Sequence, residues 1–447
     1  MNKLISYAVR IIGSSGFART VLASLLGSAA IRIAGMGFGF LIAIQLARSL
    51  GPSSYGIYGI AMSFVAISAV MSDMGSSRTA VRDVSAGMSN RDWSLVKTVI
   101  GWSNKTTIKF SITISGLLFS LNYFINDVAS SLHKTIAVAC ILIPITALLN
   151  VQSGIIRGFH KVPRAQMLDG LLRPAIYSAL LLVASNIAPF SPELAMGLGG
   201  ISIAISLAVG FALLQRLIPE EVRQAKLIRT TGWINRSSAM AYSETVRVLQ
   251  PHSTILLLGA FSTDSMVGAY RAATSLLVLL GTAETIINLS SAPFIAKLHA
   301  ESNREKQQKL VSILCITMFI GTAVVSYPFL AYGGETISLL LGEDFRTAVL
   351  PLFIMSSAVL VSSALGPSAV ILNMSNMEKL VSRSSTMSLL VIVCIGPVLI
   401  INYEAVGAAT TYAISLIVSR FLNWVHVHKH VSIDSSLFGS FITLLRR

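Results

Sequence analysis

Arginine side chains lie inside three apolar segments of this sequence, each of which is long enough to cross a lipid bilayer. The residues are Arg32, Arg173 and Arg247. A charge at the centre of a bilayer costs about 2.5–3.5 kcal/mol on insertion scales, so such residues usually face a cavity or a partner. A guanidinium can donate paired hydrogen bonds to a phosphate or a carboxylate. These arginines are therefore candidates for binding an anionic ligand within the membrane.

Two of the arginines have an acid within one helical turn. Asp169 precedes Arg173 by four residues and Glu244 precedes Arg247 by three, so either pair could neutralise itself on one helix face. We favour self-pairing for Asp169 and Arg173, and a cavity role for Glu244 and Arg247. Arg32 has no acid within one turn of its own helix and must find a partner elsewhere. It is the strongest single candidate for a functional residue.

Further ionisable groups lie nearer the ends of the apolar segments. Asp73 and Glu284 lie toward the cytoplasmic side of the topology that the loop charges predict, and Arg271 lies toward the opposite end. The acids, Asp169 and Glu244 included, could repel an anionic headgroup, orient the arginines or bind a coupling cation. The sequence leaves these roles open. Arg271 could guide the release of a ligand or simply extend to the membrane interface.

Residues that loosen a helix occur at matching depths. Gly35 and Gly39 lie in the first apolar segment and Pro251 in the seventh, and Gly39 precedes Pro251 by 212 residues. Glycine and proline permit helix bending, and paired interruptions in corresponding segments indicate a transport site. Close helix packing is the alternative for the two glycines. We predict a hinge role for these three positions.

No set of residues in the sequence indicates covalent chemistry. Acids in the loops are scattered, no Walker-type glycine-rich loop is present, and the three cysteines lie far apart in apolar segments. His426, His428 and His430 follow the last segment without an acidic or thiol partner nearby, which favours a solvated tail over a metal site. We predict a protein that is not an enzyme and needs no cofactor or metal, with coupling to H⁺ or Na⁺ left open.

These residues require a scaffold that spans a membrane. Of 447 residues, 53% are hydrophobic and only 12% are charged, and the mean hydropathy is +0.73, so lipid must cover much of the surface. A helix needs about 20 apolar residues to span the bilayer core. The sequence predicts an all-α integral membrane protein with about twelve spans, near 21–46, 55–77, 106–125, 135–156, 163–185, 194–217, 237–261, 267–292, 309–330, 348–373, 380–401 and 404–425.

The charges of the loops predict the orientation. Of 34 Lys and Arg residues, only Arg48, Lys134 and Arg346 fall in the loops on one side, and the positive-inside rule assigns the other, basic loops to the cytoplasm. Both termini are then cytoplasmic. The net charge of +15 belongs to these loops, so it does not indicate nucleic acid as a partner. The N-terminal residues lack the apolar core and small-residue end of a cleaved signal.

The chain contains two similar halves. Gly56 and Tyr58 recur as Gly268 and Tyr270, an offset of 212 residues, at the start of corresponding spans. Because each half has six spans, an even number, both halves enter the membrane in the same direction. A two-fold axis along the membrane normal should then relate them, with a central cavity between them. We predict five parts: an amphipathic cytoplasmic lead-in at 1–20, a six-helix bundle at 21–217, a cytoplasmic interfacial linker at 218–236, a second six-helix bundle at 237–425 and a cytoplasmic tail at 426–447.

A longer motif surrounds the first of these repeats. Residues 47–58 (ARSLGPSSYGIY), followed by 73–75 (DMG) and Arg82, resemble the first two helices of Wzx-type polysaccharide flippases, which belong to the multidrug/oligosaccharidyl-lipid/polysaccharide (MOP) exporter superfamily. Looser matches follow at 156–159 (IRGF), 267–273 (VGAYRAA), Pro293, 341–345 (LGEDF) and Gly366-Pro367. The resemblance covers nearly the whole chain.

The resemblance implies two six-helix bundles around a V-shaped central cavity, lined mainly by helices one, two, seven and eight, and transport by alternating access. The implied cargo is an undecaprenyl-diphosphate-linked oligosaccharide, such as an O-antigen (lipopolysaccharide) or exopolysaccharide repeat unit. It would move from the cytoplasmic to the periplasmic leaflet of a bacterial inner membrane. Arg32, Arg247, Arg173 and Arg271 would bind its anionic part. A polysaccharide polymerase and chain-length machinery are the expected protein partners.

Two other functions fit parts of the sequence. A cation-coupled multidrug exporter of the same superfamily would share the fold but should have a more acidic cavity. A membrane polymerase or ligase of lipid-linked glycans would be expected to have a long periplasmic loop with paired arginines, which the sequence lacks. The basic character of the intramembrane residues therefore favours transport of an anionic cargo.

Overall fold

The computed structural model describes residues 16–185, 190–228, 233–301 and 303–445, so most of the predicted lead-in at 1–20 lies outside the described residues. Every regular element in these ranges is a helix, as expected where lipid offers the backbone no hydrogen-bond partner. The first half contains α2 (Gly16–Asp73), α3 (Ser76–Asn90), α4 (Trp93–Ile125), α5 (Ser131–Gly158), α6 (Val162–Met167), η1 (Leu168–Leu172), α7 (Arg173–Ala184), α8 (Pro192–Leu217) and α9 (Glu220–Gln224). The second half contains α10 (Trp233–Phe261), α11 (Asp264–Ala300), α12 (Arg304–Ala331), α13 (Gly333–Leu340), η2 (Glu343–Ala348), α14 (Val349–Ser363), α15 (Ser368–Met374), α16 (Glu378–Val431) and α17 (Leu437–Leu445).

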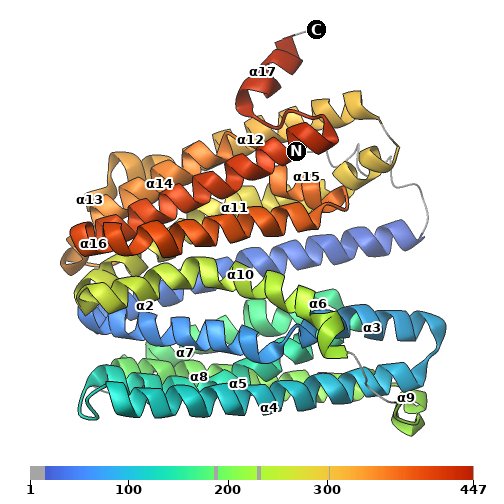
Figure 1. Cartoon of the computed structure of the whole chain (residues 1–447), viewed down its shortest axis with the longest axis horizontal. Coiled ribbons are helices and arrows are strands. Elements are labelled where there is room, and N and C mark those ends of the chain that lie inside the picture. Colours follow the sequence, from blue (N-terminus) through green and yellow to red (C-terminus); the bar gives the residue numbers. More distant parts are fainter. Residues whose placement is uncertain (1–15, 186–189, 229–232, 302, 446–447) are drawn as a thin grey trace.

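Within the described ranges, nine helices are long and apolar enough to cross a membrane. Two of them, α2 and α16, are hairpins (Figure 1), because each has one non-helical residue: Gly51 (φ 69°) and Glu404 (φ 47°). Glycine adopts such a positive φ without steric cost. Together with α10, which is 29 residues long and more polar, these elements account for the twelve spans that the sequence predicts.

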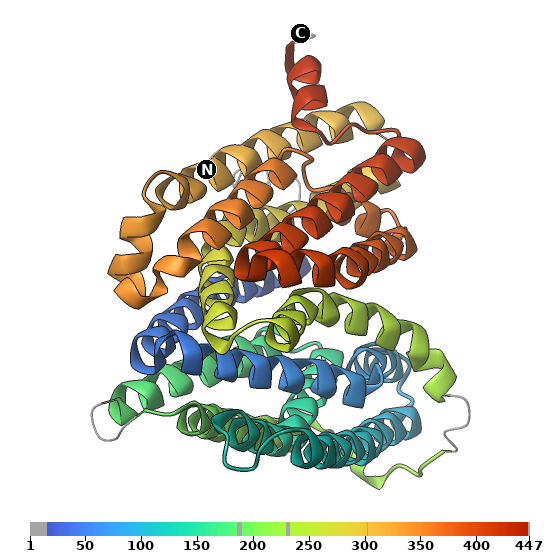
Figure 2. The ribbon, with the colours of Figure 1, turned by 60° about the vertical axis from the view of Figure 1, so that its left-hand side comes forward.

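The helices form two layers that follow the order of the sequence. In Figures 1 and 2, α3 to α8 lie below and α11 to α17 lie above, with α2 and α10 where the two layers meet. The layers meet where α11 and α10 pack against α2, so the joint between the halves consists of the first, second, seventh and eighth spans. We call the end with the bends of α2 and α16 the Gly51 face, and the opposite end, with α3 and α17, the α3 face.

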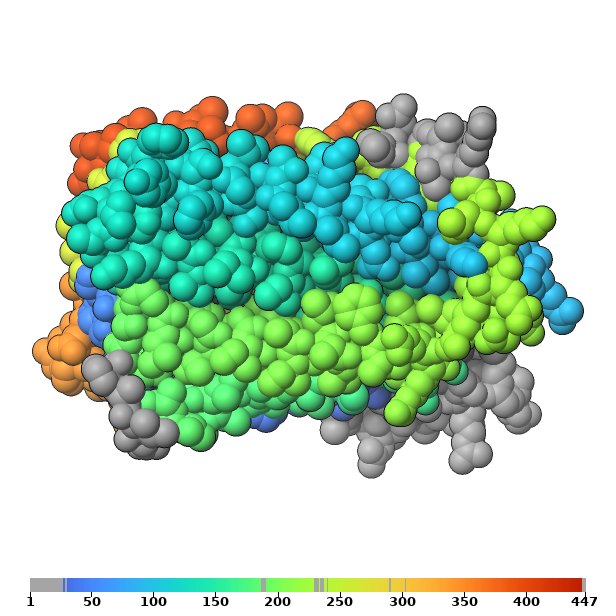
Figure 3. Space-filling view, turned by 90° about the horizontal axis from the view of Figure 1, so that it is seen from below, coloured from blue at the N-terminus to red at the C-terminus, as the bar shows by residue number. Residues whose placement is uncertain are grey.

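Apolar side chains cover the outer surface of the layers. Figure 3 shows one such surface, on which α4 and α8 lie on either side of α5. On α4, Leu117 is 61% exposed and Phe124 is 84% exposed, and Val209 and Phe211 of α8 are exposed as well. A continuous apolar surface of this kind requires contact with lipid. The core between the helices is built from small and branched residues such as Ala47, Ile143 and Ala273.

Several helices are longer than the apolar spans. α4 begins at Trp93, thirteen residues before the predicted span, because the Asp92 carboxylate caps it by accepting a hydrogen bond from the Leu95 amide (2.9 Å). α16 continues to Val431, past the predicted end at 425. α10 already begins at Trp233, whose buried ring packs on Trp102 at 5.3 Å. The predicted linker at 218–236 thus overlaps the start of α10, and among the described residues between α8 and α10 only α9 is helical.

Candidate functional site

A cavity of about 440 Å³ lies between the first leg of α2 and the segment formed by η1 and α7. It brings together five residues singled out by the sequence, namely Arg32, Asp169, Arg173, Gly35 and Gly39. The other lining residues are Met36, Ile42, Tyr58, Gly170, Pro174, Tyr177 and Val278. Val278 belongs to α11, so both halves contribute to this α2 cavity.

Two glycines let the first leg of α2 form this wall. A Cβ at Gly35 would lie 1.9 Å from the carbonyl oxygen of Gly170, so only glycine permits the approach of α2 to η1. Gly39 has no atom near its missing Cβ within 4 Å, and its lack of a side chain leaves space in the cavity. At Gly35 the structure therefore shows the close packing that was the alternative to a hinge.

The two charges on η1 and α7 do not form an ion pair with each other in the described structure. η1 is a π-helix, in which the Arg173 amide bonds to the carbonyl of Leu168, five residues back, and this widened turn changes the register of residues four apart. The Asp169 carboxylate instead accepts a hydrogen bond from the Ser153 hydroxyl at 2.8 Å. Its Oδ1 atom is buried without a partner among the described residues. The expected ion pair is therefore absent from the described residues, and Arg173 lines the cavity together with Asp169.

Arg271 stacks on tyrosines behind the cavity. Its guanidinium carbon lies 5.4 Å and 5.1 Å from the ring centres of Tyr55 and Tyr58, within the range of a cation–π interaction. The Tyr177 hydroxyl donates a hydrogen bond to that of Tyr58 at 3.1 Å, and both rings line the cavity. A Cβ at Gly59 would lie 2.6 Å from Arg271 Cδ. The structure thus encloses Arg271 between the halves.

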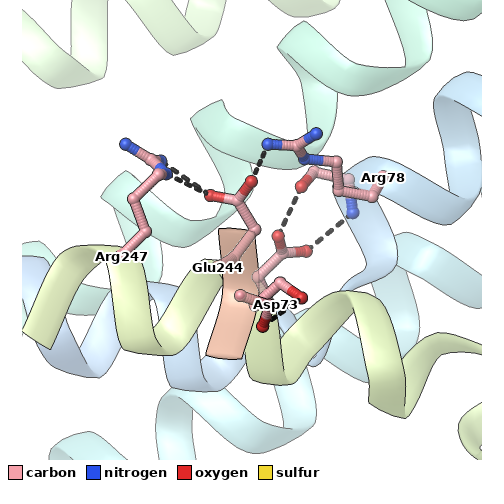
Figure 4. Close-up of polar contacts among 7 residues, drawn as sticks. Asp73, Arg78, Glu244 and Arg247 are labelled. Carbon is pink, nitrogen blue, oxygen red and sulfur yellow. Dashed lines mark hydrogen bonds and ion pairs between the residues drawn. The ribbon is translucent and has the colours of Figure 1, made fainter. Parts of the chain in front are cut away.

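A second charged group lies at the α3 face and joins the halves. Glu244 of α10 pairs with Arg247 (2.6 Å) and also with Arg78 of α3, and Asp73 lies beside them, where it accepts hydrogen bonds from the amide and hydroxyl of Ser77 at 2.9 and 2.5 Å (Figure 4). We call Asp73, Arg78, Glu244 and Arg247 the ionic cluster.

In the ionic cluster, two arginines share the single carboxylate of Glu244. Burial, followed by the positive charges of Arg247 and Arg157, lowers the pKa of the Arg78 guanidinium. The Glu244 side chain is only 15% exposed, whereas that of Arg247 is 67% exposed. Arg247 can therefore reach an anion from outside while it remains paired with Glu244.

The remaining predicted residues lie elsewhere. Glu284 of α11 forms an ion pair with Arg420 of α16, and each side chain is 19% exposed, so this acid is neutralised within the second half and is absent from the lining of the α2 cavity. α10 continues through Pro251 without a non-helical residue in its described length.

Arg32 lies near the middle of the first leg of α2, which runs from Gly16 to the bend at Gly51. Arg32 therefore lies about 28 Å from that bend at ~1.5 Å per residue. The bilayer core is about 30 Å thick. By the same measure, Arg271 lies about 10 Å from the start of α11 at Asp264. The arginines therefore lie at different depths along the joint.

Sequence reasoning missed several of these contacts. Arg78 lies just past the second span and was counted among the loop charges, and Arg420 was not weighed as a partner for Glu284. Tyr58 ends the repeated motif and Gly59 follows it, and the offset of 212 relates Gly59 to Arg271. That relation was a usable signal, because residues that correspond in two halves can meet at the axis between them.

Comparisons with known proteins identify the family and the fold of the chain. Residues 21–299 match the model of a family described as polysaccharide biosynthesis protein. A curated relative from Haloferax volcanii, described as probable low-salt glycan biosynthesis flippase Agl15, is 21% identical over 405 residues, which cover 90% of this chain and 82% of the relative.

Two solved structures share the fold. The inward-facing conformation of a multidrug resistance MATE family transporter of the MOP superfamily matches with a TM-score of 0.75 at 14% identity, and the match covers 90% of this chain and 98% of the transporter. The inward closed conformation of the lipid II flippase MurJ matches with a TM-score of 0.69 at 12% identity, covering 94% and 90%. The chain therefore has the fold of these transporters over most of its length.

Proposed function

The chain belongs to the polysaccharide biosynthesis protein family, and we propose that it is a flippase that moves a lipid-linked glycan across a membrane by alternating access of its two halves. The Haloferax volcanii relative is described as a glycan biosynthesis flippase, and both solved structures with this fold are transporters. Family and neighbours thus indicate transport rather than catalysis. The chain itself is a multi-pass membrane protein.

The observation that carries the proposal is the α2 cavity. Arg32 and Arg173 line it with one acid, Asp169, so its lining is net positive in a region where charges are expensive. A diphosphate offers the oxygens that arginine binds in pairs. We therefore propose a polyprenyl diphosphate, of the undecaprenyl type in a bacterial inner membrane, as the carrier of the glycan. Asp169 is the acid best placed to accept a coupling H⁺ or Na⁺.

The proposal extends to the organisation of the chain. The bundles at 21–217 and 237–425 would act as the two moving bodies, with 218–236 as their cytoplasmic connection and both termini in the cytoplasm. The glycan would be an O-antigen or exopolysaccharide repeat unit, received by a polymerase and its chain-length machinery. The likeness to a multidrug transporter favours drug export as the second candidate, but the excess of arginines in the lining opposes a cationic drug.

The test is transport by the reconstituted full chain with Arg32→Ala, Arg173→Ala or both. Each substitution removes charge-assisted hydrogen bonds that contribute about 1.5–3 kcal/mol. The rate at which the chain flips a polyprenyl-diphosphate-linked glycan should therefore fall roughly 10- to 100-fold. Arg32→Lys should restore only part of the rate, because lysine cannot bind in pairs. Arg304→Ala, at an exposed position that starts α12, is the matched control. Full transport by the double variant would overturn the role of the cavity arginines.

In the native cell, deletion of the gene should cause lipid-linked glycan to accumulate in the cytoplasmic leaflet. Accumulation of unpolymerised units on the opposite side would instead indicate an enzyme acting after translocation.

A further inference from the structure

A second cavity, of about 610 Å³, lies between the two legs of α16. We call it the α16 groove. One leg contributes Arg383, Ser384, Met387, Leu390, Val391, Cys394 and Ile395, and the other Val418, Leu422 and His426. Met387 and Leu390 are 52% and 48% exposed, so the groove opens to the lipid side. It is apolar along its length and basic at one end.

The groove has the length and direction of a lipid chain in one leaflet. Its first stripe runs from Arg383 to Ile395, twelve residues or about 18 Å of helix. Half of the ~30 Å hydrocarbon core is about 15 Å. Because Arg383 precedes the bend at Glu404 by 21 residues, its end of the groove lies toward the α3 face. The groove thus extends from that face to about the middle of the membrane.

The end of the groove at the α3 face has the charge that a phosphate requires. Arg383 and His426 line it, and Lys429 and His430 follow within one turn of His426, whose ring centre lies 6.0 Å from that of His430. Within the described ranges, neither Arg383 nor Lys429 forms an ion pair. Basic residues at this depth attract anionic lipid headgroups.

The groove lies beside the ionic cluster. Contacts between α10 and α16 join the hydroxyls of Tyr242 and Thr386 (2.8 Å), and the Gln250 amide donates to the Ser385 carbonyl (3.4 Å). These contacts place residues 385–386 of α16 level with residues 242–250 of α10. Arg383 therefore lies near the depth of Arg247, with α10 between the groove and the joint of the halves.

We propose that the α16 groove holds the part of the polyprenyl tail next to the diphosphate, with the diphosphate at Arg383, before the headgroup passes to Arg247 and the α2 cavity. This assignment rests on the proposed flippase function. A single channel between two stripes of side chains suits a one-chain lipid such as a polyprenyl diphosphate better than a two-chain phospholipid. The tail would remain in lipid while the polar part moves between the halves.

The native thiol of Cys394 provides the first measurement. Cys394 lines the groove and is exposed, whereas Cys140 and Cys315 are buried. Saturating polyprenyl diphosphate should slow alkylation of Cys394 by a lipid-soluble maleimide about tenfold in the reconstituted full chain. The same amount of phosphatidylglycerol should have little effect. Equal protection by phosphatidylglycerol would show an ordinary lipid site and overturn the proposal.

Variants with matched controls provide the second measurement. A photoreactive polyprenyl diphosphate should label residues 383–395 and 418–426, and Leu390→Trp, which fills the groove, should reduce this labelling about tenfold. Val393→Trp, also exposed on α16 but outside the groove, should not. Arg383→Ala should reduce labelling similarly, with Arg304→Ala as its control. Labelling that Leu390→Trp leaves unchanged would overturn the groove assignment.

The two proposals fail in different ways. Loss of groove labelling with intact flipping removes the groove alone. If the groove is labelled but the reconstituted full chain does not flip the glycan, the flippase function is overturned. The groove would then be a lipid-binding site with a different function.

Discussion

Glu244 makes the ion pairs that join the halves at the α3 face. One carboxylate, 15% exposed, pairs with Arg247 on its own helix and with Arg78 on α3. If the carboxylate is lost, two arginines face each other with no negative charge between them. Removing one partner of a partly buried ion pair destabilises a protein by more than the intact pair stabilises it, because a charge is left buried and unpaired.

We predict that Glu244→Gln increases amide hydrogen exchange in α3 about tenfold or more, because Arg78 and Arg247 then repel each other and release α3 from α10. Glu305→Gln is the control, since Glu305 pairs with Lys309 on an exposed surface, where such pairs contribute little. Unchanged exchange in α3 would mean that apolar packing alone holds the two helices.

At the residue scale, the sequence pointed to only some of the charges that meet and not to their partners, since two of the four arginines proposed for the cargo line the α2 cavity. Arg32, Asp169 and Arg173 meet at one cavity, because intramembrane charges must share the few polar places available. The hydrogen bond from Ser153 to Asp169 depends on the π-turn of η1. A pattern of residue types does not reveal such a turn, since it differs from an α-helix only in one hydrogen-bond register.

At the scale of elements, two glycines join the halves in a reciprocal way. A Cβ at Gly56 would lie 1.9 Å from the carbonyl oxygen of Asp264, and a Cβ at Gly268 would lie 1.9 Å from that of Pro52. Asp264 corresponds to Pro52, and Gly268 to Gly56, at the offset of 212. This is the contact pattern of a two-fold axis, in which the same surface is used twice.

Because the two contacts are equivalent, Gly56→Ala and Gly268→Ala should destabilise the fold by similar amounts, about 1–3 kcal/mol each, through overpacking against backbone. Thermal unfolding in detergent, followed by circular dichroism, measures the effect. Gly37→Ala, where no atom lies within 4 Å of the new Cβ, should leave stability unchanged or slightly higher. A large loss at one glycine only would contradict the reciprocal contact.

Hydropathy predicted the number of helical legs better than their lengths. The length of an apolar run reflects the thickness of the lipid core. A helix, in contrast, ends where its terminal backbone N–H or C=O groups form hydrogen bonds with groups outside the helix. Asp92 therefore starts α4 well before the apolar run, and α16 extends beyond it to Val431.

At the scale of the whole molecule, both ends of the joint have backbone contacts, and one end has ion pairs as well. Gly56 and Gly268 make the backbone contacts at the Gly51 face, and at the α3 face a Cβ at Gly75 would lie 2.6 Å from the carbonyl oxygen of Ser237 in α10. The α3 face also has the ionic cluster, where Arg247 is largely exposed. Salt screens exposed charges, so the contact at the α3 face should weaken more at high ionic strength than the contact at the Gly51 face.

The orientation can be tested with the same elements. Alkaline phosphatase fused after Arg447 should be inactive, and a fusion after Asp127, in the loop between α4 and α5, should be active, because basic loops remain in the cytoplasm. An active fusion after Arg447 would invert the topology and place the α3 face outside.

Arg271 contacts Gly59, its own counterpart at the offset of 212. Corresponding positions of the two halves meet here, so glycine and arginine can be combined in three ways. Two glycines leave a hole, two arginines repel each other, and one glycine with one arginine fills the space. Only two halves of different sequence can have one glycine and one arginine at this site. If the chain arose by duplication, the two copies had to diverge at this site before the tyrosines could hold a cation, and a dimer assembled from two identical halves could not reproduce it.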